Sequence, residues 1–264
     1  MNSVFMIKVQ SGQIIDIRTD RYNVNGGPGD ENNYNGHRAE YIAKDGEQEF
    51  EALNWIFGEK VIYSFPKNVE ILSLKFRESG YSTKFIGDFK CDNEKINTLI
   101  AKCKRTLYVC MRDNFMDCPD RERGQWIGDV SVQVSQVFYS LDRKASLLVK
   151  KAIYDFINLR KNDKLVGNVP GINFWELPSQ SLLSISNFGL LGRYYEFTGD
   201  KKTLELSFKP IIQYLLLWEM GQDGLVEKRE GDWYWFDHLN AIDSKILENE
   251  LYYNALIFVI YYYL

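Results

Sequence analysis

The sequence predicts a mainly helical protein with a β region at its N-terminus. Up to about residue 85, apolar residues alternate with polar ones or form short runs bounded by Gly, Pro and Asn, as in strands and turns. Beyond residue 88, apolar residues recur every three or four positions over long stretches, as on one face of a helix. We therefore expect part of a β-sandwich over residues 1–86 and a helical domain over residues 87–264.

Strands are expected over residues 4–9, 14–18, 61–65 and 71–77. The first two flank Ser11-Gly12 and predict a hairpin, and the run of Asn and Gly over residues 22–36 predicts a loop. In the last strand, alternation places three apolar side chains on one face: Leu72, Leu74 and Phe76. The pattern is typical of a sandwich, but a sheet with so few strands needs further partners to cover its edges.

Helices are expected over about residues 96–110, 130–141, 148–162, 182–197, 202–220 and 243–264. Gly199 occupies the usual C-terminal cap position after the fourth helix, and Pro210 is expected to kink or split the fifth. The short connections between successive helices imply antiparallel hairpins.

The last helix carries no stop signal, because neither Gly, Pro nor a polar cap follows residues 259–264. A helix this apolar needs neighbours on nearly all sides, and no later residues supply them. We therefore expect the sequence to end within its helical domain, and the β region likewise to begin within a domain.

Charge and composition argue against several classes of partner. A formal net charge of −4 offers no basic surface for a phosphate backbone, so nucleic acid is not expected as a partner. The four cysteines contain no CxxC pair and the two histidines are far apart, so neither a metal site nor another cofactor is expected. Residues 251–264 are too short to cross a bilayer, so no membrane partner is expected, and residues 1–8 lack the pattern of a secretory signal.

Residues 117–129, which we call the acid-bearing loop, lie between two predicted helices and contain Pro119, Gly124 and Gly128. Loops held on rigid helices often carry binding groups. This loop combines three acids with an arginine and a tryptophan: Asp117, Glu122, Asp129, Arg121 and Trp126. Carboxylates accept hydrogen bonds from hydroxyls, arginine orients a carboxylate and an indole covers a ring face, which together predict a site for a polyhydroxylated ligand.

Each of these residues also has a structural interpretation. Asp129 directly precedes a predicted helix and could be its N-cap. Arg121 could pair with a neighbouring acid on the surface, which stabilises little, and Trp126 could fill a core. Taken singly, these structural interpretations are at least as probable as the functional ones. Only the coincidence of all these residues in one loop favours a binding site.

The pattern Asp-Cys-Pro-x-Arg-Glu-Arg-x-x-Trp-x-Gly-Asp over residues 117–129 resembles the signature of the α-L-rhamnosidase family of glycoside hydrolases. Residues 76–81, 87–92 and 105–107 resemble that family's join between a β-sandwich and a helical domain. Asn173-Phe-Trp-Glu176 and Gly231-Asp-Trp233 resemble its later aromatic loops that contact sugar. Gly124-Gln125 departs from the family pattern, which puts the edge of the pocket in question but not the acid.

The resemblance implies an (α/α)6 toroid of six helical hairpins, incomplete in this chain. Its central funnel would bind a terminal α-L-rhamnosyl residue of a glycoside or polysaccharide and hydrolyse it with inversion. By motif position, Glu122 is the general acid. The sugar contacts implied are Asp117, Arg121 and Asp129, which hold the hydroxyls or the acid, and Trp126, Trp175 and Trp233, which line the pocket.

The family's general base is a glutamate well downstream of Trp233, and this chain ends about thirty residues after that position. We therefore expect the base to be absent, with Glu176, Asp232 and Asp237 as the only nearby substitutes. The isolated chain is expected to be inactive or nearly so unless a second chain supplies the missing hairpins. Two alternatives stay open: a six-hairpin glycosidase for another sugar, and a non-catalytic sugar-binding fragment.

Overall fold

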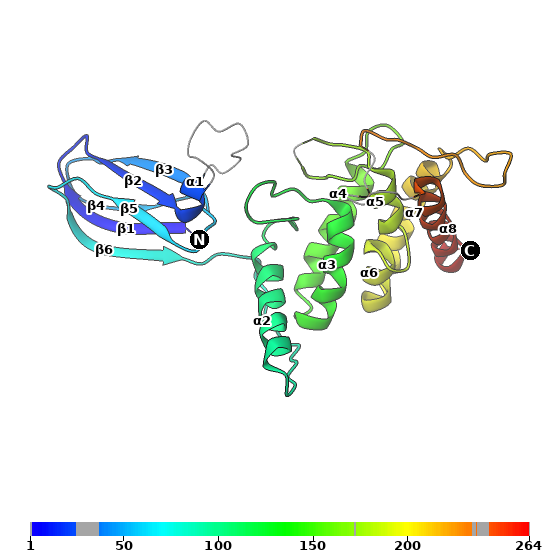
Figure 1. Ribbon diagram of the computed structural model, residues 1–264, viewed down its shortest axis with the longest axis horizontal. Helices are drawn as coiled ribbons and strands as arrows, with labels where there is room; N and C mark the ends of the chain where they lie inside the picture. Colours follow the sequence, from blue (N-terminus) through cyan, green and yellow to red (C-terminus); the bar gives the residue numbers. More distant parts are fainter. Residues whose placement is uncertain (1, 25–36, 172, 234–235, 237–242, 264) are drawn as a thin grey trace. The chain divides into compact units, whose positions relative to one another are not determined.

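The computed structural model describes residues 2–24, 37–171, 173–233, 236 and 243–263 (Figure 1). The chain divides into two compact units. Unit 1 comprises Met1–Gly80 with Pro119–Arg121, and unit 2 comprises Tyr81–Cys118 with Glu122–Leu264. The sheets of unit 1 are antiparallel and unit 2 is helical, so the predicted fold class, a β region followed by helical hairpins, is confirmed.

In its described residues, unit 1 has two three-stranded antiparallel sheets and a short helix. One sheet has the order β4 (Gly46–Glu51), β1 (Asn2–Val9), β6 (Glu70–Arg77). The other has the order β3 (Arg38–Ile42), β2 (Ile14–Thr19), β5 (Val61–Ser64). Helix α1 (Asp20–Val24) follows β2, where a loop was predicted, and the rest of that loop, residues 25–36, lies outside the described residues.

The hairpin predicted for the first two strands is wrong, because β1 and β2 belong to different sheets. Both strands are apolar on the face that each turns inward, and Phe5, Ile7, Ile15 and Ile17 share one buried cluster. Pairing the two strands edge to edge would leave their sheets without this common core. Local turn chemistry at Ser11-Gly12 therefore joins the strands, and burial decides what they pair with.

Strand β6 confirms the strand predicted over residues 71–77, but burial does not alternate along it, and its apolar side chains are exposed. Leu74 lies opposite Phe5 in register, yet Leu72, Leu74 and Phe76 are 40%, 47% and 63% exposed. The second sheet covers β1 but does not extend over this edge strand.

Unit 2 contains seven helices among the described residues. They are α2 (Glu94–Val109), α3 (Ile127–Ser140), α4 (Ala145–Asn158), α5 (Pro178–Ser184), α6 (Leu190–Thr198), α7 (Lys201–Leu215) and α8 (Ser244–Tyr263). Gly199 caps α6 in the left-handed conformation, as predicted, with φ of 65°. Pro210 does not split α7, which continues through it to Leu215.

One predicted helix, over residues 182–197, is in fact two. α5 ends at Ser184 and α6 begins at Leu190. A Cβ at Gly189 would stand 1.9 Å from the Leu183 carbonyl oxygen, so the chain can fold back on α5 only with glycine at this position. The buried Ser131 hydroxyl of α3 accepts the Leu190 N–H at 3.3 Å, which serves a donor at the start of α6.

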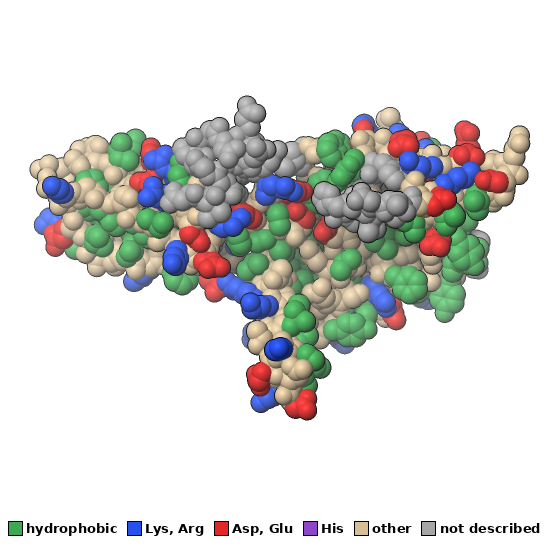
Figure 2. Space-filling model, viewed as in Figure 1, with side chains coloured by type: hydrophobic (Ala, Val, Ile, Leu, Met, Phe, Trp, Pro, Cys, Tyr) green, Lys and Arg blue, Asp and Glu red, His purple; other side chains and the backbone are tan. Residues whose placement is uncertain are grey.

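The helices pack around one core, and Figure 1 shows α2 at one end of their array and α8 at the other. Of the predicted apolar stripe of α2, Ile96 is 42% exposed and only Leu107 is buried within the helix. On α8, Phe258 is buried, whereas Ile260 and Tyr261 are 57% and 75% exposed. Figure 2 shows apolar side chains at the surface along α2 and toward the α8 end. None of the described helices combines the length and apolarity that a membrane span needs.

Asp200 joins three helices, and its removal should destabilise unit 2. Its carboxylate accepts hydrogen bonds at 2.8 Å from Lys150, Tyr194 and Thr203, and it caps α7 through the Thr203 N–H. The bond from Lys150 is the main reason that the pKa of Asp200 lies below its usual 3.8.

We expect Asp200→Asn to lower the free energy of unfolding by about 2 kcal/mol at pH 7, the size of a hydrogen bond to a charged group. Because the folded-state pKa is depressed, this contribution is complete above the unfolded pKa and is lost as pH falls through the folded pKa. The difference between wild type and variant in urea unfolding should therefore shrink below about pH 4. Glu196→Gln, at an exposed pair with Arg193, is the control and should change little.

Candidate active site

Three tryptophans that are far apart in sequence meet in unit 2, and we call them the indole cluster: Trp126, Trp175 and Trp233. Their ring centroids lie 6.0–6.4 Å apart, all in edge-to-face arrangement. Trp126 is buried, Trp175 is partly buried and Trp233 is 42% exposed. The cluster therefore runs from the interior to the surface, as a wall that a ring-shaped ligand can contact.

The acid-bearing loop closes on itself through Asp117 and Gly124. The Gly124 N–H donates to Oδ1 of Asp117 at 3.1 Å, and the Asp117 N–H donates to the Gly124 carbonyl at 3.0 Å. Between them, Arg123 has a φ of 54°, a left-handed conformation that side chains other than Gly rarely adopt. The chain therefore turns sharply directly after Glu122.

The buried thiol of Cys110 lies beside this loop, with its Sγ 4.0 Å from the Asp117 carbonyl oxygen. Burial raises the pKa of Cys110 to about 12, and the charges of Cys118, Asp117 and Asp129 act in the same direction. Burial also raises the pKa of Asp117, and the charge of Glu122 adds to this. Glu122 itself is partly buried.

The interpretation of Asp129 as an N-cap is wrong. Helix α3 begins at Ile127, and the residue at its N-cap position is Trp126, whose side chain makes no capping hydrogen bond. Asp129 is the third residue of α3, where its charge is favourable to the helix dipole. The helix therefore starts earlier than its apolar stripe predicted, and it carries both Trp126 and Asp129 at its first turn.

Arg121 falls in the segment Pro119–Arg121, which is grouped with unit 1, and its side chain is exposed. In that segment Asp120 accepts hydrogen bonds from Arg21 at 2.7 and 3.0 Å. His37 lies 2.8 Å from the other oxygen of Asp120, and its Nδ1 accepts the Phe57 N–H at 3.3 Å. The His37 proton therefore sits on Nε2 and is donated to Asp120.

Gln125 anchors the loop, although sequence reasoning noted it only as a departure from the family pattern. Its side chain is fully buried and donates to Val169 O at 2.6 Å and Asp155 Oδ2 at 3.1 Å, while it accepts the Phe115 N–H at 3.1 Å. The signal available in the sequence was a polar residue placed between Gly and Trp, a position that would otherwise suit an apolar side chain. Gln125 fixes the loop directly before Trp126.

Asn168 is a second residue that sequence reasoning missed. Its Oδ1 and the Nε1 of Trp126 are buried with no hydrogen-bond partner among the residues that the structure describes. A Cβ added to Gly124 would stand 3.0 Å from the first atom and 3.1 Å from the second. Glycine at position 124 therefore allows the Asn168 amide and the Trp126 indole to approach the loop together.

We expect Gly124→Ala to displace Trp126 and to lower the free energy of unfolding by about 1–3 kcal/mol, the usual cost of overpacking. Urea unfolding and the circular dichroism of the indoles measure the two effects. Gly199→Ala is the control, because its Cβ would meet no atom within 4 Å although its φ is positive. It should cost stability through backbone strain and leave the indole signal unchanged, and an unchanged indole signal in Gly124→Ala would contradict the prediction.

Of the three substitutes considered for the general base, Glu176 is wholly buried and paired with Lys164 and Arg229 at 2.9 and 2.7 Å. Asp232 is partly exposed and bound to Lys161 at 3.1 Å, and Asp237 lies outside the described residues. A buried, doubly paired carboxylate has no position from which to activate a water molecule. In the described part of the chain, no group of three or more Cys, His, Asp or Glu side chains could hold a metal ion.

Helical hairpins that carry a loop of carboxylates beside clustered indoles are an arrangement suited to a glycosidase. Residues 84–263 match the model of the bacterial alpha-L-rhamnosidase six-hairpin glycosidase domain, which is more than half of the chain. The chain therefore belongs to the bacterial α-L-rhamnosidase family.

Solved structures agree with this assignment at the level of the fold. The rhamnosidase of Bacillus sp. GL1 superposes with a TM-score of 0.74 and 17% identity over 99% of this chain. The Klebsiella oxytoca rhamnosidase with rhamnose bound gives 0.73 and 13% over 99%. The Streptomyces avermitilis α-L-rhamnosidase complexed with L-rhamnose gives 0.72 and 15% over 98%. This chain spans 29%, 55% and 26% of those three proteins, and no curated protein matches it.

Proposed function

We propose that this chain binds a terminal α-L-rhamnosyl residue between its acid-bearing loop and its indole cluster, and that Glu122 is the general acid of an inverting hydrolysis. The observation that carries the proposal is the connection of these two features through Gly124. The Gly124 N–H binds Asp117, and its α-carbon faces Nε1 of Trp126. Acids and indoles are therefore neighbours in one unit, and two related proteins were solved with rhamnose bound.

In this mechanism Glu122 gives its proton to the glycosidic oxygen while the bond from that oxygen to the anomeric carbon breaks. A base removes a proton from water, which attacks the same carbon from the opposite face and inverts its configuration. Asp117 and Asp129 accept hydrogen bonds from the sugar hydroxyls, and Arg121 orients these hydroxyls or the acid. Trp126, Trp175 and Trp233 cover the apolar face of the ring.

The general base comes, in this proposal, from a segment outside these 264 residues. Glu176 and Asp232 support this, since both are held by cations. Further helical hairpins, from a continuing polypeptide or from a second chain, would also cover the exposed apolar side chains of α2 and α8. The chain alone should then release little rhamnose, and robust release from an aryl rhamnoside would overturn the proposal of an absent base.

Azide tests the acid without the base, because this anion attacks carbon without first losing a proton. With phenyl α-L-rhamnoside, azide should form a C–N bond at the anomeric carbon while the C–O bond breaks and Glu122 protonates the departing phenolate. The product expected is β-L-rhamnosyl azide, identified by NMR spectroscopy. Formation of the α-azide would exclude inversion, and a faster reaction with another aryl glycoside would assign the site to a different sugar.

A non-catalytic sugar-binding role is the second candidate, favoured by the ion pairs that occupy Glu176 and Asp232. Calorimetry with L-rhamnose separates the two. Binding that is equal in wild type and Glu122→Gln, together with no azide product from either, would identify a binding module. Azide product from wild type alone identifies the enzyme.

A further inference from the structure

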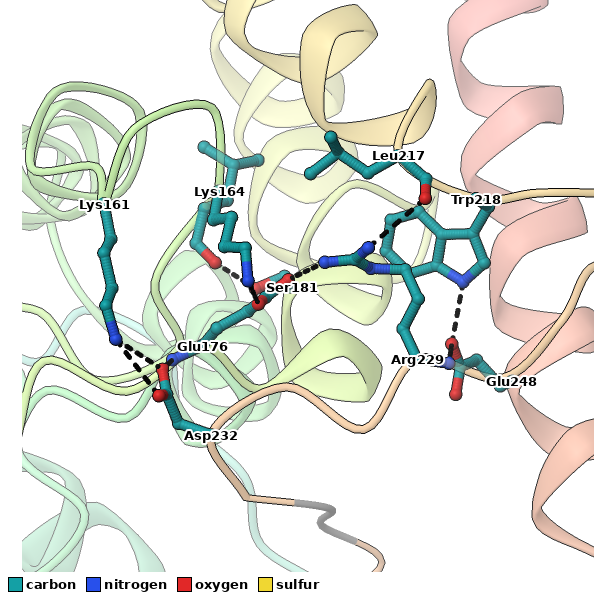
Figure 3. Close-up of polar contacts among 10 residues, drawn as sticks. Lys161, Lys164, Glu176, Ser181, Leu217, Trp218, Arg229, Asp232 and Glu248 are labelled. Atoms are coloured by element: carbon teal, nitrogen blue, oxygen red, sulfur yellow. Dashed lines mark hydrogen bonds and ion pairs between the residues drawn. The ribbon is translucent and has the colours of Figure 1, made fainter.

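A network of charged side chains surrounds the buried Glu176, and a site for a neutral sugar does not by itself require it (Figure 3). The Glu176 carboxylate is fully buried, with Oε1 2.7 Å from Nη2 of Arg229 and Oε2 2.9 Å from Nζ of Lys164. Pairing with two cations offsets the cost of burying a charged carboxylate. The side chain of Glu176 is therefore held from two directions.

The main chain at Glu176 is fixed as firmly as the side chain. The Glu176 N–H donates to Oδ2 of Asp232 at 2.8 Å, and the Asp232 N–H donates to the Glu176 carbonyl at 3.0 Å. Lys161 donates to both oxygens of Asp232 at 3.1 and 3.2 Å. Glu176 directly follows Trp175 and Asp232 directly precedes Trp233. This reciprocal pair of hydrogen bonds therefore fixes the backbone from which both indoles extend.

Arg229 connects the pair to the helices. Its Nη1 donates at 3.2 Å to the carbonyl oxygen of Leu217, two residues after the end of α7, and its guanidinium lies 5.0 Å from the centre of the Trp218 ring. The backbone N–H of Arg229 donates to Oε1 of Glu248 on α8 at 3.0 Å. The same oxygen accepts the Trp218 indole N–H at 2.7 Å. The segment that carries Asp232 and Trp233 is therefore tied to α7 and α8.

We propose that Glu176 and Asp232 are positioning residues that set Trp175 and Trp233 at their angle to Trp126, so that the three indoles form one sugar-binding wall. The binding of sugar by this wall rests on the proposed function, whereas the positioning of the indoles does not. A network that only stabilised the fold would change stability without changing the arrangement of the three rings.

The test measures, without ligand, the circular dichroism signal that arises from coupling between neighbouring indoles. The part of this signal that Trp233→Phe removes is taken as the share that comes from the indole cluster. Asp232→Ala removes the acceptor of the Glu176 N–H and should abolish that share. Asp232→Asn keeps an acceptor oxygen and should restore at least half of it. Glu230→Ala, two residues away at an exposed ion pair with Lys228, should leave the signal unchanged.

Calorimetry with L-rhamnose on the same proteins gives the second readout. Asp232→Ala should bind about tenfold more weakly than wild type, with recovery in Asp232→Asn. In a second outcome, Asp232→Ala loses the coupling signal while no form of the protein, wild type included, binds rhamnose. That result would support the positioning role and reject rhamnose as the ligand of the indole wall. Unchanged coupling in a folded Asp232→Ala would overturn the positioning role whatever happens to binding.

If Asp232→Ala does not show a cooperative thermal transition, Lys161→Met supplies the comparison. This variant removes only the half-exposed cation of Asp232 and keeps every acceptor. A reduced coupling signal supports the proposal, and an unchanged signal overturns it.

Discussion

Glu122→Gln is expected to slow the azide-supported cleavage of phenyl α-L-rhamnoside by about 10²–10⁴-fold, the usual contribution of a general acid. The glutamine keeps the size of the side chain and its carbonyl oxygen, but it has no acidic proton to give to the phenolate. Binding of L-rhamnose should change little, because the sugar hydroxyls and the indoles are untouched. Initial rates of phenol release, measured at saturating azide, give the comparison.

The leaving group provides the internal control for this variant. A dinitrophenolate departs without protonation, so the loss with 2,4-dinitrophenyl α-L-rhamnoside should stay within about tenfold. Glu196→Gln removes an exposed carboxyl elsewhere in unit 2 and should keep the wild-type rate with both substrates. Equal losses in Glu122→Gln for the two leaving groups would mean that Glu122 is not the proton donor.

Glu176→Ala is expected to have the largest effect on stability, lowering the free energy of unfolding by about 3–5 kcal/mol. The change leaves the cations of Lys164 and Arg229 beside a buried space without the carboxylate that both contact. Urea unfolding followed by far-ultraviolet circular dichroism measures the loss, and a change of less than about 1 kcal/mol would show that the pairing is no stronger than a surface ion pair.

Two further variants separate charge from packing at this position. Glu196→Ala breaks an exposed ion pair and should cost at most about 1 kcal/mol. The double variant Glu176→Leu with Arg229→Met replaces the ion pair by apolar side chains and should recover part of the stability lost in Glu176→Ala. Absence of any recovery would show that neither the cavity nor the unpaired charge of Arg229 causes the loss.

Several features of the fold followed from local patterns and were confirmed. The alternation over residues 71–77 produced β6, the apolar stripes produced helices, and Gly199 capped α6. Local pattern failed where a distant contact competed with it. β1 and β2 flank a turn but pair in different sheets, and a continuous apolar stripe over residues 182–197 is broken where the chain must fold back at Gly189.

The sequence by itself determined the class of each region, the family and the acid-bearing loop, because these depend on residue type and spacing along the chain. Only the tertiary structure decided that Trp126, Trp175 and Trp233 meet at 6.0–6.4 Å, and that Glu176 is buried and paired with Lys164 and Arg229. The physical reason is that burial and pairing depend on what the rest of the chain brings to a residue. Whether a carboxylate at position 176 is open to water or paired with a cation depends on neighbours that are up to 53 residues away in the sequence.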